Sequence, residues 1–144
     1  MSMLFESSYS AFGFYTALNA LIMLVLAMLV VRARVSTKTP IGDGGIPEMA
    51  GPMRAHGNNI EYVPMGLLLM WVLTTPIGGS IWLIHAVGVP LTLGRLLHGF
   101  GLSRSTGTTP FRFLGVILTW ISFIIGIVAV LWLIFVPQAS AIAQ

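Results

Sequence analysis

The sequence has 144 residues, of which 56% are hydrophobic and only 8% are charged, and its mean hydropathy is +0.94. So few charges exclude a water-soluble globular domain and indicate an integral membrane protein. Because the chain has no cysteine, disulfides, thiolate metal sites and a cysteine nucleophile are excluded, and we expect no bound metal. The seven basic residues form no run and lie beside apolar segments, which argues against nucleic acid as a partner.

Hydropathy predicts four membrane spans that take up most of the chain. They cover residues 10–31, 54–75, 80–102 and 112–136. Each is close to the ~20 residues that cross the core of a bilayer. The connections are too short to hold a separate soluble domain, so we expect a single domain over residues 1–144. The predicted fold is an all-α integral membrane protein with four transmembrane helices.

Charge is concentrated at the first and third loops. The basic residues outside the second and third spans all gather there: Arg32, Arg34, Lys38, Arg104 and Arg112. The turn at 75–80 and the tail at 137–144 carry no charge. The positive-inside rule then places the first and third loops in the cytoplasm and both termini outside. Five aromatic residues map to the opposite interface, as an aromatic belt would: Tyr9, Tyr15, Trp71, Trp82 and Trp132.

Prolines and glycines predict where helices end and bend. In the first loop, Pro47 and Pro52 are expected to break helix. In the third, Thr109 is a predicted N-cap with Pro110 at the first helical position. Pro64 lies inside the second span and is interpreted as shaping that helix rather than taking part in chemistry.

Three charged residues lie inside the predicted spans. Arg54 and Glu61 are in the first half of the second span, and Arg95 is in the last half of the third. In an up-down-up-down chain these halves lie in the same leaflet. A charge at that depth costs roughly 2.5–3.5 kcal/mol on insertion scales, and such residues usually serve function. The sequence therefore predicts a polar pocket in one leaflet.

Helical spacing arranges the polar residues in stripes. Arg54, Asn58 and Glu61 follow one another at i, i+4 and i+7, with Tyr62 at the edge of the same face. A second stripe on the third span consists of Arg95, His98 and Leu102.

Two interpretations fit these stripes. Glu61 and Arg95 could form an intramembrane ion pair that holds the helices together. Alternatively, the stripes could bind a ligand, because Arg54, Arg95 and Arg112 face one Glu61, with Arg32 close by. An excess of positive charge at membrane depth requires an anion. A ligand with several carboxylates and one amine would suit this set, since arginine grips carboxylates bidentately and Glu61 accepts from an ammonium group.

The stretch Arg54–Pro64, with the spacing Arg-x-x-x-Asn-x-x-Glu-x-x-Pro, resembles the signature of the MAPEG family. These membrane-associated proteins of eicosanoid and glutathione metabolism include microsomal glutathione transferases, leukotriene C4 synthase and microsomal prostaglandin E synthase. Residues 31–34 resemble the basic end of the family's first helix, residues 94–98 its third-helix motif, and residues 110–112 the entrance to its fourth helix. The match extends over essentially the whole chain and is nearest to short bacterial members.

The resemblance implies a homotrimer in a bacterial cytoplasmic membrane, with glutathione as co-substrate bound between subunits. It assigns the glutathione ligands Arg32, Arg54, Asn58, Glu61, Tyr62 and Arg95, and His98 joins them on its stripe. Arg112 matches the arginine that stabilises the glutathione thiolate. A free thiol has a pKa of about 8.5, and an adjacent guanidinium lowers it, which raises the population of the nucleophile.

The leading expectation is a glutathione transferase or peroxidase that acts on lipophilic small molecules entering from the lipid bilayer. A non-catalytic ligand-binding protein of the same fold is the alternative. Leu102 stands where catalytic relatives often have tyrosine, and Phe113 stands where prostaglandin E synthase has serine. A small transporter is the third possibility, but the apolar outer halves of all four spans argue against access from both sides.

Overall fold

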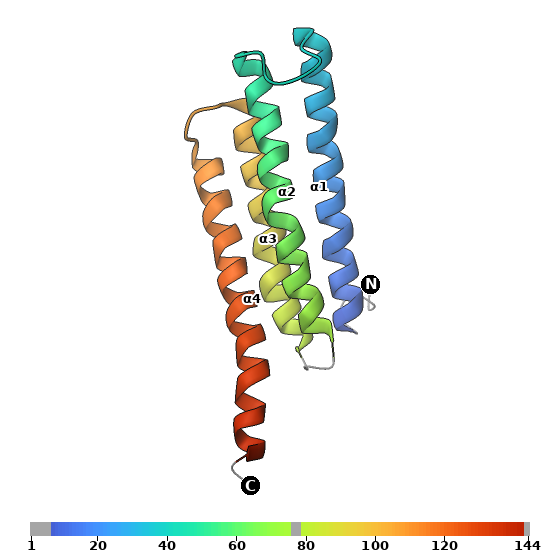
Figure 1. The fold of residues 1–144 in the computed structure, drawn as a ribbon, viewed down its shortest axis with the longest axis vertical. Helices are drawn as coiled ribbons and strands as arrows, with labels where there is room; N and C mark the ends of the chain where they lie inside the picture. Colours follow the sequence, from blue (N-terminus) through green and yellow to red (C-terminus); the bar gives the residue numbers. More distant parts are fainter. Residues whose placement is uncertain (1–6, 76–78, 143–144) are drawn as a thin grey trace.

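The computed structural model describes residues 7–75 and 79–142, with side chains up to residue 135. Within these residues it contains four helices: α1 (Ser8–Thr37), α2 (Pro47–Thr74), α3 (Ile81–Arg104) and α4 (Pro110–Ile142). Figure 1 shows them packed side by side in alternating directions, with the α1–α2 and α3–α4 loops at one end and both described termini at the other. We call the first of these the loop end. The predicted all-α membrane bundle is confirmed.

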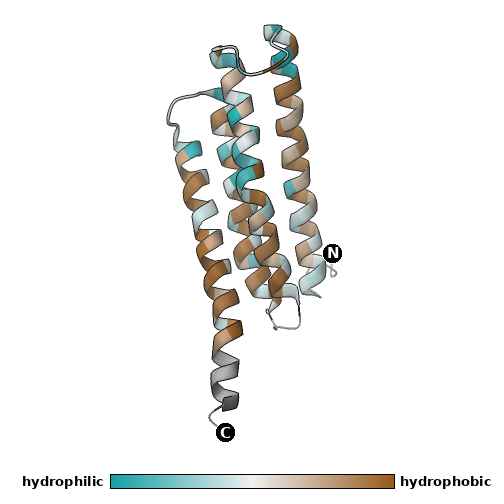
Figure 2. Cartoon of the chain, viewed as in Figure 1, coloured by the Kyte–Doolittle hydropathy of each residue, from teal (hydrophilic) through white to brown (hydrophobic). Residues whose placement is uncertain are grey.

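Three helices are long and apolar enough to span a membrane: α1, α3 and the part of α4 that ends at Phe135. With 28 residues, α2 is also long enough, at roughly 42 Å. Its mean hydropathy is lower because polar residues occupy the half near the loop end, which Figure 2 shows in teal. The polar half of α2 therefore lies beside apolar helices rather than in a soluble domain.

The helices extend beyond the predicted spans at the loop end. The expectation that Pro52 breaks helix is wrong, because α2 begins at Pro47 and runs through Pro52 and Pro64. Pro52 removes only one backbone hydrogen bond, and α2 is packed at this point, where Met49 and Gly51 are buried. The tail expected after Pro137 is likewise helical up to Ile142. Within the predicted turn at 75–80, residues 76–78 lie outside the described residues.

Local hydrogen bonds define both loops. Lys38 ends α1 in the left-handed conformation (φ 55°), and its N–H donates to the carbonyl of Arg34. The Arg34 guanidinium donates to the carbonyls of Thr39 and Gly42, which ties the first loop to α1. At the third loop the N–H of Arg112 donates to Thr109 Oγ1 at 3.2 Å. Thr109 is thus the N-cap of α4, as predicted.

Helices α3 and α4 approach closely where glycines face each other. A Cβ atom added to Gly115 would lie 2.6 Å from the backbone nitrogen of His98 and 2.7 Å from the carbonyl oxygen of Gly94. Small residues of this kind allow two helix backbones to come together in a membrane. This contact brings the side chain of Thr119 on α4 within reach of Arg95 on α3.

The end of the bundle away from the loops carries aromatic residues, with one correction. Tyr9, Trp71, Trp82 and Trp132 are exposed, as expected of an aromatic belt. Tyr15 is instead buried in the core, where its hydroxyl lies 2.8 Å from His85 Nδ1. Gly88 makes room for the ring, because a Cβ at this position would collide with it. Tyr15 is a packing residue rather than an interface anchor.

Candidate functional site

A cavity of about 260 Å³ opens at the loop end between α2, α3, α4 and the third loop. We call it the loop-end cavity, and its lining is Ala50, Arg54, Asn58, His98, Leu102, Thr106 and Arg112. Four of the predicted site residues meet here: Arg54, Asn58, His98 and Arg112. They come from three different helices. The fold therefore brings Arg54 and Arg112, which are 58 positions apart in the sequence, to one cavity.

Arg95 is buried beside this cavity, with 1% of its surface exposed. Its Nε and Nη2 donate to Thr119 Oγ1 at 3.0 and 2.6 Å, and its Nη1 donates to Asn58 Oδ1 at 2.8 Å. Its Cζ atom lies 5.2 Å from the centre of the Tyr62 ring. Within the described residues it makes no ion pair with Glu61. The buried charge is therefore stabilised by neutral oxygens and an aromatic face.

Asn58 links this buried network to the surface of α2. Its oxygen accepts from Arg95, and its Nδ2 lies 3.5 Å from Glu61 Oε2 as a long donor. Glu61 is exposed, while Tyr62 is half-buried and packs edge-on against Phe123 with ring centres 5.9 Å apart. Glu61 and Tyr62 thus lie next to the loop-end cavity without lining it.

Arg112 is held at the cavity by the third loop. Its Nη1 donates to the carbonyls of Thr106 at 3.1 Å and Gly107 at 3.4 Å. Among the described residues, its Nε and Nη2 have no hydrogen-bond partner, and neither has the exposed side chain of Arg54. His98, 4% exposed, also lines the cavity without a hydrogen bond in this part of the chain. Two guanidinium groups consequently retain donors for an anion.

Arg32 is not brought to this cavity. It is exposed on α1 and lines a separate hollow between α1, α3 and Pro52 near the start of α2. Within one subunit, Arg32 therefore lies apart from the other predicted glutathione ligands.

The sequence interpretation missed Thr119, which accepts two of the three side-chain hydrogen bonds of Arg95. Thr119 Oγ1 also donates to the carbonyl of Gly115 at 2.8 Å, one turn earlier in α4. The available signal was a polar residue within a very apolar span, one turn after a glycine. Thr106 was missed as well, because a loop residue shows no periodicity that would place it in a cavity.

A family model, that of the MAPEG family, matches residues 12–132, a range that contains every predicted site residue. The chain belongs to the MAPEG family. It is 33% identical over 118 residues to the inner membrane protein YecN of Escherichia coli strain K12, which covers 82% of this chain and 88% of that protein. YecN of Escherichia coli O6:H1 strain CFT073 matches with the same values. The resemblance carried by the signature Arg54–Pro64 is confirmed, and this MAPEG protein is a membrane protein.

We predict that Thr119→Val lowers the stability of this MAPEG protein, whereas Thr119→Ser preserves it. Valine leaves two buried N–H donors of Arg95 without an acceptor, which costs about 1–3 kcal/mol. Serine keeps the hydroxyl and loses only a methyl group. The measurement is thermal unfolding in detergent followed by circular dichroism. Equal melting temperatures for wild type and Thr119→Val would contradict the assignment of Thr119 as the stabilising acceptor.

Proposed function

We propose that this MAPEG protein binds glutathione in the loop-end cavity and uses its thiolate, as a transferase or peroxidase, on lipophilic electrophiles that enter from the bilayer. One observation carries the proposal: Arg54 and Arg112 line the same cavity with guanidinium donors that have no partner in the described chain. The family includes glutathione transferases and peroxidases, and that membership supports the same ligand.

The donor set suits glutathione chemically. The tripeptide has two carboxylates, one ammonium group and one thiol. Arg54 supplies a bidentate grip for a carboxylate, and the exposed carboxylate of Glu61 suits the ammonium group. Asn58 presents its amide at a fixed angle because Arg95 holds its oxygen. We therefore assign Arg95, three of whose N–H groups are already engaged, to positioning Asn58 beside the ligand.

Arg112 is the proposed catalytic residue. A thiolate, not a thiol, is the nucleophile, and a nearby guanidinium favours the charged form. Carbonyls of the third loop hold Arg112 by one nitrogen, which leaves Nε and Nη2 to face the sulfur. His98 adds a second nitrogen donor or acceptor to the same cavity.

We further propose that the site is completed by neighbouring copies in a homotrimer. Glu61 and Arg54 are exposed, and Arg32 lies in another hollow, so one subunit offers the ligand only part of its partners. The α2 face beside Glu61 also exposes large apolar side chains, among them Ile60, Met65 and Leu68. A neighbouring subunit would cover this face and bring in its own Arg32. We place the protein in a bacterial cytoplasmic membrane with the loop end inside.

A non-catalytic ligand-binding protein is the second candidate, and Leu102 favours it. Leu102 lines the loop-end cavity where catalytic relatives often have tyrosine, so no phenolic hydroxyl is available there. Phe113 is exposed on α4 and also lacks a hydroxyl. This candidate shares the proposed ligand and differs in having no turnover.

We predict that Glu61→Gln weakens glutathione binding strongly. Removing one partner of a charged pair that becomes buried on binding commonly costs roughly 2–5 kcal/mol. The measurement is calorimetric titration of glutathione into purified protein in detergent. Glu48→Gln is the matched control, because Glu48 is exposed at the same end of α2 and outside the loop-end cavity. Equal affinities for wild type and Glu61→Gln would show that the signature does not serve glutathione here.

We predict that Arg112→Ala and Arg54→Ala fail in different ways. Arg112→Ala should keep measurable glutathione affinity but lose the ultraviolet absorbance of the thiolate and the turnover of a model electrophile. Arg54→Ala should mainly raise KM, since loss of binding common to ground and transition states leaves kcat unchanged. An unchanged thiol pKa in Arg112→Ala would remove the thiolate role from Arg112. A wild type that binds glutathione without forming thiolate would favour the non-catalytic candidate.

We predict that two defective subunits complement each other. If one subunit supplies Glu61 and its neighbour supplies Arg32, mixed trimers of Arg32→Ala and Glu61→Gln chains contain some intact sites, whereas neither homotrimer contains any. Glutathione titration of the mixed assembly should therefore recover part of the binding, with native mass spectrometry confirming its composition. No recovery in verified mixed trimers, or a stable monomer that binds glutathione, would contradict the shared site.

A further inference from the structure

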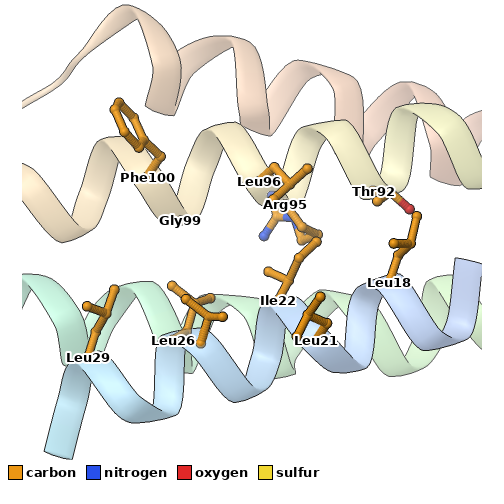
Figure 3. A pocket seen from close by; sticks show the side chains of 11 residues that line it. Leu18, Leu21, Ile22, Leu26, Leu29, Thr92, Arg95, Leu96, Gly99 and Phe100 are labelled. Atoms are coloured by element: carbon orange, nitrogen blue, oxygen red, sulfur yellow. The ribbon is translucent and has the colours of Figure 1, made fainter.

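An apolar hollow of about 330 Å³ lies between α1 and α3, deeper in the bundle than the hollow that Arg32 lines. Figure 3 shows leucine and isoleucine side chains of α1 directed toward α3 along its length. Residues 18–29 of α1 follow this hollow for roughly 16 Å. That length is about half of the ~30 Å hydrocarbon core of a bilayer. The hollow is thus as long as the acyl region of one leaflet.

At the loop end this apolar hollow continues into the hollow that Arg32 lines. A space of about 380 Å³ shares Leu29 and Phe100 with it and is also lined by Arg32, Ser103 and Arg104. The guanidinium of Arg104 lies over the Phe100 ring, with its Cζ atom 4.0 Å from the ring centre. We call the two spaces together the α1–α3 groove. The apolar part of the groove therefore ends at the Phe100 ring, which the guanidinium of Arg104 covers.

The positive charge at this end has no counterpart in the described chain. Neither Arg32 nor Arg104 forms an ion pair or a side-chain hydrogen bond among the described residues. Glu48 lines an adjoining hollow with Arg104 but forms no ion pair with it. A zwitterionic headgroup would bring its own cation to this site, whereas an anionic headgroup would neutralise the charge.

We propose that the α1–α3 groove binds an anionic phospholipid from the leaflet at the loop end, with an acyl chain along residues 18–29 and the phosphate against Arg104. Three observations support this occupant: the apolar length matches one leaflet, the unpaired charge lies at the end where the headgroup would be, and Phe100 joins the two parts. The headgroup contact is assigned to Arg104 because Arg32 is proposed to reach the glutathione of a neighbouring subunit. The groove and the loop-end cavity have different lining residues, and Arg95, which lines the groove, lies between them because it also holds Asn58 of the cavity.

The test is lipid retention from nanodiscs that contain equal amounts of phosphatidylglycerol and phosphatidylcholine, read by native mass spectrometry of the released protein. Wild type should retain phosphatidylglycerol in preference to phosphatidylcholine. Arg104→Gln should reduce that preference about fivefold, the usual contribution of one arginine at a membrane surface. Lys38→Gln is the matched control, because it removes the same charge from the same end of the protein outside the groove and should leave the preference unchanged.

A second pair of variants tests the acyl part independently of charge. Val25 lines the groove, whereas Met28 is exposed on α1 outside it. Val25→Trp should fill the groove and reduce retention of phosphatidylglycerol, and Met28→Trp should not. Equal retention of the two lipids by wild type, or equal behaviour of both tryptophan variants, would overturn the proposal. So would an Arg104→Gln protein with wild-type helicity and wild-type lipid preference.

Discussion

The architecture of the site depends on one buried cation. Arg95 lies inside a membrane bundle with 1% of its surface exposed, and a charge there is tolerated only when protein atoms replace water around it. The atoms that do so come from two other helices: the hydroxyl of Thr119 on α4 and the amide oxygen of Asn58 on α2. Satisfying this one side chain therefore requires α2, α3 and α4 to keep a single relative rotation, which the close contact between Gly94 and Gly115 permits.

Because neutral oxygens satisfy Arg95, the carboxylate of Glu61 is not consumed by an internal ion pair. It stays exposed on α2, and among the described residues it is joined to the buried network only through the long contact with Asn58. Arg54 and Arg112 likewise keep guanidinium donors that no described residue uses. The buried guanidinium of Arg95 is thus satisfied inside the bundle, whereas Glu61, Arg54 and Arg112 keep polar groups available at the loop end. This arrangement suits the proposed ligand site, because a buried charge that already has partners does not compete for the ligand.

Much of this arrangement could be predicted from the sequence, and the part that could not has a physical reason. Hydropathy predicts the helices, and the spacing of Arg54, Asn58 and Glu61 predicts that they share a face, because both properties belong to one helix. Which side chain becomes the hydrogen-bond partner of Arg95 depends instead on two helices, namely on how they are rotated and how closely they pack. Glu61 was a possible partner for Arg95 by charge, yet the glycine contact brings Thr119 nearer. The expectation that Pro52 breaks the helix failed for a similar reason, because the packing of the whole of α2 outweighs the local effect of one proline.

The family assignment does not by itself decide the reaction, since one fold supports several chemistries through the side chains placed in its site. In this chain the proposed binding residue Asn58 and the proposed thiolate-stabilising residue Arg112 are fixed by different elements: Asn58 by Arg95 of α3, and Arg112 by carbonyls of the third loop. Binding and thiolate stabilisation can therefore vary independently. Leu102 supplies no hydroxyl group to the cavity, unlike the tyrosine of catalytic relatives, and Arg112 lines the same cavity. Since a guanidinium can favour a thiolate without help from a phenol, leucine at position 102 is compatible with the proposed thiolate at Arg112, and it would limit only those substrates whose activation needs a hydroxyl group.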